Sequence, residues 1–185
     1  MIAVIILSFI FMFSELFLSI TKRTKSDLAK IRKDRGTEII NWLAIAGGLT
    51  AGFFLARYSV WSTINYLVSS AGILIFISGV LIRWIAVSQL KESFTVDVSI
   101  SKTHVLKTDG LYSNIRHPSY LGLILITFGL SVAMNSWKSI LMVMVPVLIA
   151  LNYRIFVEER ILTGEFGGEY LNYKSRTRKL IPGIF

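Results

Sequence analysis

The residues best suited to chemistry lie in one stretch, GLYSNIRHPSYLG, which runs from Gly110 to Gly122. Gly110 is typical of a turn, and Pro118 favours the first position of a helix. His117 would then cap that helix, whose amides near Ser119 can hold an anion. The alternative is membrane anchoring, because aromatic and basic side chains gather at headgroup level whether or not a ligand binds. Taken alone, the motif favours anchoring.

A second pair of candidate residues is Arg154 and Glu158, which lie four positions apart at the end of an apolar run. This spacing places both side chains on one face of a helix. They could form a simple ion pair, although arginine before glutamate is the weaker order for such a pair. A charge inside an apolar span is a functional candidate by default. Arg83 and Glu15 are two further charges of this kind; Arg83 could simply snorkel, and Glu15 is interpreted as an isolated packing or cavity residue.

Several kinds of chemistry have little support in the sequence. The chain has no cysteine, which excludes disulfides, zinc–thiolate sites, iron–sulfur clusters and thiol nucleophiles. Its two histidines, His104 and His117, follow no known metal-ligand spacing, so no metal is predicted. No G-x-G-x-x-G motif or P-loop is present, so a nucleotide-type cofactor would not bind in a Rossmann crevice.

Membrane helices must position these residues. The composition is 54% hydrophobic and only 17% charged, against about 25% charged in an average soluble domain. The first apolar run is followed by basic residues instead of a cleavage site, so it is interpreted as a span and not as a signal peptide. The short connection between the last two runs predicts an antiparallel hairpin. We therefore predict a single-domain, all-α integral membrane bundle of about five transmembrane helices, at residues 1–20, 39–55, 66–87, 119–134 and 139–157.

The basic residues predict the orientation of this bundle. Of the 20 lysine and arginine residues, sixteen fall in the segments 21–38, 88–118 and 158–185. The positive-inside rule then places the N-terminus outside and the C-terminus in the cytosol. No segment outside the spans is long enough to form a basic soluble module, so no nucleic-acid partner is expected. Segments 88–118 and 158–185 are expected to dock on the helix ends and to form a pocket at the cytosolic face.

The second apolar run carries a stripe of small residues. Ala44, Gly48, Gly52 and Ala56 recur every four positions, which places them on one helix face. Small residues let another helix approach closely, and we expect this contact within the chain more than between two copies.

The second half of the chain resembles the isoprenylcysteine carboxyl methyltransferase family of integral membrane enzymes. The similar motifs follow the order of that family, while the first half shows only generic spans. The resemblance implies methyl transfer from S-adenosylmethionine at the cytosolic face, with Arg154 contacting the substrate. It also implies cofactor contacts from His104, Val105, Leu106, Lys107, Tyr112, His117, Pro118, Ser119, Tyr120 and Glu158. The motifs lie at residues 83–90, 104–112, 116–122, 154–159, 166–173 and 180–182.

This function is compatible with the chemistry of the residues. S-adenosylmethionine is soluble and zwitterionic, so its pocket must open to the cytosol. Glu158, the amides after His117, and Tyr112 or Tyr120 could supply an acceptor, donors and an aromatic surface. An acceptor that is already an anion needs little acid or base catalysis, so no general base is predicted. Arg154 would orient a carboxylate that enters sideways from the bilayer.

Other functions remain open at this point. The expected partners are membrane lipids and a lipophilic methyl acceptor, most simply an isoprenylcysteine-like carboxylate; a phospholipid amine or a small thiol are alternatives. An NADPH-dependent sterol-type membrane reductase is similar around Arg116-His-Pro, but it ranks lower because the chain is short for that class. A small carrier or scaffold would show repeats or broken helices, and neither is visible.

Overall fold

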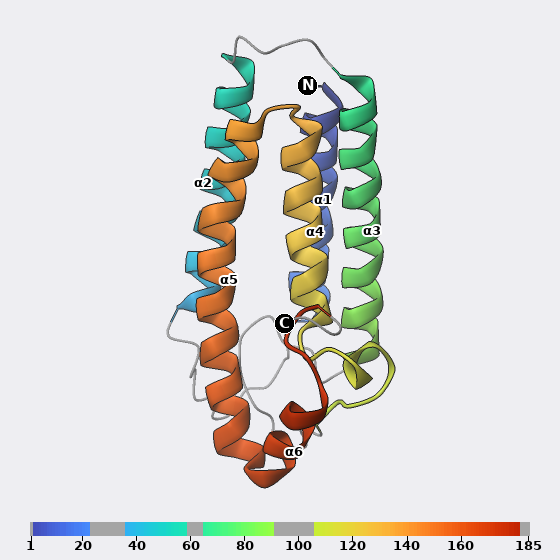
Figure 1. Cartoon of the computed structure of the whole chain (residues 1–185), viewed down its shortest axis with the longest axis vertical. Coiled ribbons are helices and arrows are strands. Elements are labelled where there is room, and N and C mark those ends of the chain that lie inside the picture. Colours follow the sequence, from blue (N-terminus) through green and yellow to red (C-terminus); the bar gives the residue numbers. More distant parts are fainter. Residues whose placement is uncertain (1, 23–35, 59–64, 91–105, 182–185) are drawn as a thin grey trace.

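The computed structural model describes residues 2–22, 36–58, 65–90 and 106–181, with the backbone alone described for residues 19–22. These residues form an all-helical bundle without strands, which confirms the predicted fold class (Figure 1). Five helices run alongside one another, and a short helix and a 3-10 turn lie at one end. They are α1 (Ile2–Lys22), α2 (Thr37–Arg57), α3 (Tyr66–Leu90), η2 (Gly110–Ser113), α4 (Pro118–Ala133), α5 (Trp137–Phe166) and α6 (Gly168–Arg176).

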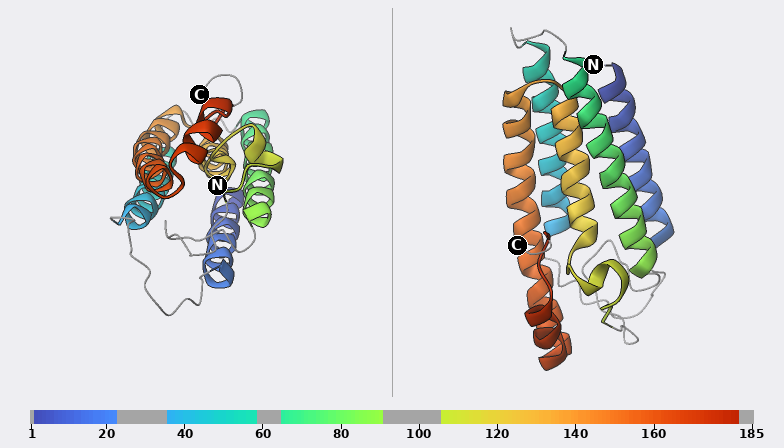
Figure 2. Two further views of the ribbon diagram at one scale, coloured as in Figure 1. Left: turned by 90° about the horizontal axis from the view of Figure 1, so that it is seen from below. Right: turned by 45° about the vertical axis from the view of Figure 1, so that its right-hand side comes forward.

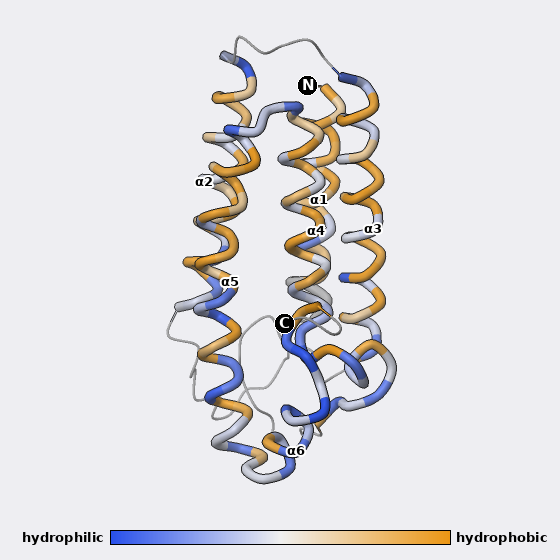
Figure 3. Tube along the Cα trace, in the orientation of Figure 1, coloured by the Kyte–Doolittle hydropathy of each residue, from blue (hydrophilic) through white to orange (hydrophobic). Residues whose placement is uncertain are grey.

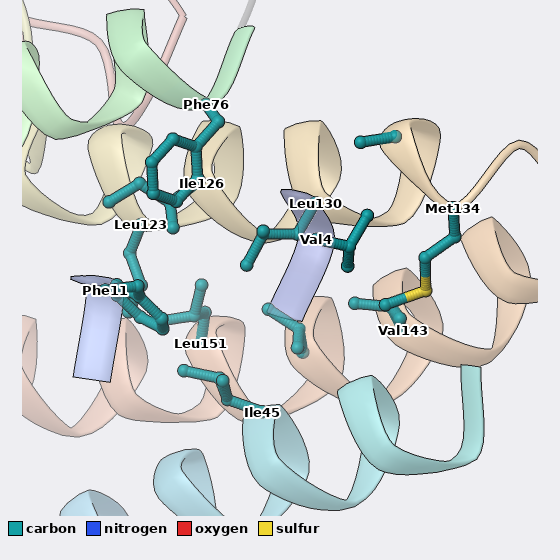
Figure 4. Close-up of a cluster of buried hydrophobic side chains, with 12 residues drawn as sticks. Val4, Phe11, Ile45, Phe76, Leu123, Ile126, Leu130, Met134, Val143 and Leu151 are labelled. Carbon is teal, nitrogen blue, oxygen red and sulfur yellow. The ribbon is translucent and has the colours of Figure 1, made fainter. Parts of the chain in front are cut away.

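Helix α4 is the central element of the bundle (Figure 2). It packs most extensively along α3, while α2 packs along α5, and the contact between α4 and α5 joins the two pairs. Helix α1 contacts α4 over a smaller surface. Side chains from all five helices meet in one apolar cluster, which includes Phe11, Ile45, Phe76, Leu123 and Leu151 (Figure 4).

Glycines set the close approach of α3 and α4. Gly72 and Gly79 lie seven residues apart on α3 and face α4, where Gly122 and Gly129 repeat the same spacing. A Cβ atom added at Gly72 would lie 2.5 Å from the backbone nitrogen of Ala133, so no larger residue fits without moving the helices apart. This is the small-residue packing that membrane helices use.

The stripe predicted on α2 is used in the same way, within the chain. A Cβ atom added at Gly48 would lie 3.2 Å from the Cα atom of Val143 on α5. One turn further along α2, the carbonyl of Gly52 accepts a hydrogen bond of 2.7 Å from the hydroxyl of Ser139. These contacts confirm close packing between helices of one molecule.

The apolar surface of the bundle suits a membrane. Helices α2, α3 and α5 are long and apolar enough to cross a bilayer, and residues 2–18 of α1 together with α4 form shorter apolar helices. Large hydrophobic side chains such as Leu43, Leu74 and Ile149 point outward and are exposed. The protein is a multi-pass membrane protein, and the count of five spans stays a prediction.

The two ends of α5 can be compared with the predicted limits of the last span, residues 139–157. The hairpin between α4 and α5 is present, and the hydroxyl of Ser136 caps α5 by accepting from the amide of Ser139. Helix α5, however, does not stop where its apolar run ends at Val157 but continues to Phe166. Residues 158–166 contain no proline, and the helix ends only at Gly167, whose φ is +52°. The candidate residue Glu158 is therefore on a helix.

Candidate functional site

Hydrophilic residues are concentrated at one end of the bundle, where α3 ends, α4 begins and α5 extends beyond its neighbours (Figure 3). The chain enters α4 as the sequence predicts, with His117 at the cap and Pro118 in the first turn. Gly110 has a φ of +62°, in the turn that precedes this helix. The amides of Tyr120 and Leu121 donate to the carbonyl of His117, each at 3.1 Å. An anion at the amides near Ser119 stays a prediction.

Tyr120 links the two charged residues that the sequence singled out. The Nε atom of Arg154 donates to the hydroxyl of Tyr120 at 2.8 Å, and this hydroxyl donates to Oε2 of Glu158 at 2.7 Å. Arg154 is buried, whereas the side chain of Glu158 is 26% exposed. The arrangement thus joins a cation inside the bundle to a carboxylate that solvent can reach.

The start of α2 also reaches this cluster. The Nη1 atom of Arg154 lies 3.3 Å from the hydroxyl of Thr37, the first residue of α2, and Thr37 is fully buried. Thr37 is not among the residues that the sequence predicts for the site, because no motif connects residues that lie 117 positions apart. The guanidinium of Arg154 therefore lies between α2 and α4.

His117 packs against the same tyrosine. Its ring stacks on that of Tyr120, with centroids 5.6 Å apart and an interplanar angle of 22°. Its Nδ1 atom lies 3.9 Å from Glu158, and its Nε2 atom lies 3.4 Å from Oε1 of Glu159. His117 is buried, so its ring supports Tyr120 from within the protein.

Glu159 anchors the C-terminal segment, although it is not among the site residues that the sequence predicts. Its carboxylate accepts from Nε of Arg116 at 2.9 Å and from Nζ of Lys174 at 2.6 Å. The main chain adds to this contact, since the amide of Arg116 donates to the carbonyl of Arg178 at 2.8 Å. These bonds hold α6 and the residues that follow it against the start of α4, and the predicted pocket at this end stays a prediction.

Tyr112 lies beside the cluster and contacts the C-terminal segment, and its contact with a cofactor stays a prediction. Its ring is buried, and its carbonyl accepts a hydrogen bond of 2.7 Å from the hydroxyl of Tyr173. Burial raises the pKa of Tyr112, and the carboxylate of Glu158 raises it further. Burial also raises the pKa of Tyr173 to about 12, so both phenols stay protonated at neutral pH.

The remaining predicted cofactor residues precede Tyr112 in the chain. Leu106 and Lys107 are half-buried, and Nζ of Lys107 bonds to Asp109 at 2.9 Å. His104 and Val105 lie outside the described residues. The structure therefore brings together the side chains of His117, Tyr120, Arg154 and Glu158 as one cluster, while the hydroxyl of Ser119 bonds to Arg83.

The contacts of Arg83 and Glu15 differ from those expected from the sequence. Arg83 does not snorkel: it is buried and binds both carboxylate oxygens of Glu15, with Nη2 to Oε2 at 2.6 Å. Glu15 is therefore not isolated. The Nη1 atom of Arg83 donates to the hydroxyl of Ser119 at 2.7 Å. A charged network thus connects α1 and α3 to the residue that precedes Tyr120, because a buried charge needs partners of this kind.

Comparison with known proteins places the chain in a family. The sequence profile of the isoprenylcysteine carboxyl methyltransferase (ICMT) family matches residues 72–164, and the chain belongs to this family. This match spans most of α3, all of α4 and most of α5, so it covers the cluster around Tyr120.

Individual relatives agree with this assignment. The chain is 33% identical over 126 residues to the protein-S-isoprenylcysteine O-methyltransferase of Saccharomyces cerevisiae. The matched region covers 67% of this chain and 53% of the yeast protein. It is 32% identical over 108 residues to the protein of the same name from Schizosaccharomyces pombe, which covers 57% of this chain and 46% of that protein. The chain thus spans about half the length of these relatives.

A solved structure shows the same fold. The structure of a eukaryotic intramembrane Ras methyltransferase, also an isoprenylcysteine carboxyl methyltransferase, superposes with a TM-score of 0.67 at 26% identity. The match covers 77% of this chain and 52% of the other.

Proposed function

We propose that the protein is an S-adenosylmethionine-dependent methyltransferase that acts at the cytosolic membrane face on the carboxylate of a lipophilic, isoprenylcysteine-like acceptor. The observation that carries this proposal is the line of hydrogen bonds from buried Arg154 through Tyr120 to the partly exposed Glu158. It offers a site for an anion on the membrane side and a site for a polar, cationic molecule on the solvent side.

The residues on the solvent side fit S-adenosylmethionine, which supplies an activated methyl group when bound. The exposed part of the Glu158 carboxylate can accept hydrogen bonds from an ammonium group or from ribose hydroxyls. The half-buried ring of Tyr120 offers an aromatic surface, and His117 holds that ring in place from behind. Tyr112 is too buried to offer its ring in the same way.

The membrane side fits a carboxylate acceptor better than an amine. Arg154 keeps its charge in an apolar environment, and its planar guanidinium can bind a carboxylate through two parallel hydrogen bonds. The same charge would repel a phospholipid ammonium group and would raise the cost of burying it. The work of the protein is therefore to hold two partners in line and to exclude water, and no general base is required.

Tyr120 has a specific role in this arrangement. It fixes Nε of Arg154 with one lone pair and orients Glu158 with its proton, so the acceptor site and the cofactor site keep a constant separation. In-line methyl transfer depends on that separation, since small misplacements of reacting groups cost large factors in rate.

The direct test uses the purified full chain in lipid nanodiscs with methyl-labelled S-adenosylmethionine. We expect label transfer to N-acetyl-S-farnesyl-cysteine, in a product from which base releases labelled methanol, as a methyl ester requires. Phosphatidylethanolamine vesicles and a small thiol serve as competing acceptors, and calorimetry compares S-adenosylmethionine with NADPH. Binding of NADPH without S-adenosylmethionine would overturn the proposal, and labelling of the amine or thiol alone would overturn the choice of acceptor.

A further inference from the structure

Among the described residues, two buried side-chain atoms have no hydrogen-bond partner, Oδ1 of Asn41 and the hydroxyl of Tyr170, and Asn41 is the one on a long helix of the bundle. Asn41 lies on α2 and is 5% exposed, and its Oδ1 atom accepts no hydrogen bond within the described part of the chain. A buried carbonyl oxygen without a donor costs free energy, and in a membrane span water does not compensate for it. An unpaired buried polar group calls for an explanation, and one such explanation is a ligand that supplies the missing donor.

The packing of α2 on α5 locates Asn41 relative to the cluster. The helices run in opposite directions and in step: Gly52 contacts Ser139, and Gly48 contacts Val143. At the polar end of the same stripe, Thr37 contacts Arg154. Four residues forward on α2 therefore correspond to four residues backward on α5.

Asn41 follows Thr37 by one helical turn on this stripe, and both are buried. By the same register its level on α5 is that of Ala150, whose methyl group offers no hydrogen-bond donor. Side chains on a helix lean toward its N-terminus, so Asn41 leans toward the level of Thr37 and Arg154. Four residues of an α-helix rise by about 6 Å. By this register, Asn41 lies one helical turn further from the polar end of the bundle than Thr37, the residue that contacts the guanidinium.

We propose that Oδ1 of Asn41 accepts a hydrogen bond from an amide N–H that the methyl acceptor carries next to its carboxylate. This inference rests on the proposed function and deepens it, because it states which carboxylates the site selects. The amide nitrogen and the carboxylate of a peptide-linked cysteine are attached to the same carbon atom. The guanidinium of Arg154 can therefore bind the carboxylate of the acceptor while Oδ1 of Asn41, one turn away, accepts from its amide N–H. Both polar groups of the acceptor are then buried with a partner.

The test compares two acceptors that differ in this one group. N-acetyl-S-farnesyl-cysteine carries the amide beside the carboxylate, and S-farnesyl thiopropionic acid lacks it. We expect kcat/KM of the unmodified protein to favour the amide compound by about fivefold or more, the worth of one neutral hydrogen bond. In Asn41→Leu this ratio should fall to about one, mainly through loss of rate with the amide compound.

A matched control and a stability measurement keep the test decisive. Asn152→Leu makes the same chemical change on the exposed face of α5, and it should leave the ratio unchanged. Because Asn41→Leu removes an unpaired polar group, its Tm in detergent should equal or exceed that of the unmodified protein. If both acceptors are methylated and Asn41→Leu keeps the original ratio, the role of Asn41 is wrong while the proposed function stands. If neither compound is methylated, the proposed function itself fails, and the inference fails with it.

Discussion

Tyr120 is the residue on which the two halves of the site meet, because its hydroxyl group bonds to both Arg154 and Glu158. Tyr120→Phe keeps the ring and its stacking on His117 but removes both hydrogen bonds. We expect a drop in methyl transfer of about tenfold to a hundredfold, as two charge-assisted bonds are lost. Tyr153→Phe, at an exposed tyrosine on α5, is the control in the same radiolabel assay. Full activity of the Tyr120 variant would remove this tyrosine from the mechanism.

Arg154 and Glu158 should serve different ligands despite this link. Glu158→Gln should weaken S-adenosylmethionine binding by about tenfold, because one charge-assisted hydrogen bond is worth about 1.5 to 3 kcal/mol. Arg154→Lys keeps the charge but loses the planar fork, so turnover should fall while cofactor affinity is retained. Calorimetry with S-adenosylmethionine and the transfer assay measure the two effects separately.

The double variant, Arg154→Lys combined with Glu158→Gln, measures the energetic coupling between these two residues. Since both bond to Tyr120, the effects of the two substitutions should not simply add. Equal losses of cofactor affinity in Arg154→Lys and Glu158→Gln would contradict the division of roles.

At the scale of elements, one buried ion pair holds the first helix to the rest of the bundle. Glu15 on α1 pairs with Arg83 on α3, and Arg83 continues to Ser119 at the start of α4. Glu15→Leu leaves the guanidinium buried with half of its partners, which should destabilise the fold by about 3 to 5 kcal/mol. Thermal unfolding in detergent should therefore show a clearly lower Tm.

The control for this prediction removes the charge as well as its partner. Glu15→Leu combined with Arg83→Met leaves no unpaired charge, so its Tm should lie above that of Glu15→Leu alone. A double variant less stable than either single variant would show that the pair acts through packing and not through charge.

At the scale of the whole molecule, we expect the site to face the cytosolic side of the membrane. The ends of α1, α3 and α5 and the starts of α2 and α4 lie toward the polar end (Figure 1). In the sequence, sixteen of the 20 lysine and arginine residues belong to the segments 21–38, 88–118 and 158–185, which begin or end at these helix ends. By the positive-inside rule, this end faces the cytosol. In sealed, right-side-out vesicles, protease should remove a tag placed before Met1, and a tag after Phe185 should be cleaved only after the membrane is opened. Two tags with the same accessibility would contradict the orientation.

Much of this protein follows from the sequence because the responsible signals are local. The apolar runs predict the helices of the bundle, since a backbone in lipid must bond to itself. Pro118 predicts where α4 begins, and the motifs around His117 and Glu158 indicate the family that the comparisons show. Each of these signals is contained in a few neighbouring residues.

The tertiary structure decided how those local pieces meet. Arg83 contacts Glu15 across 68 positions, and Arg154 contacts Thr37 across 117. The level of Asn41 relative to Arg154 follows only from the register of α2 on α5. Such contacts depend on the rotation and relative height of helices, which the glycine contacts between α3 and α4 and between α2 and α5 set. Hydrophobic periodicity specifies that a helix is buried on one face, but packing between helices decides which polar residues on those faces become neighbours.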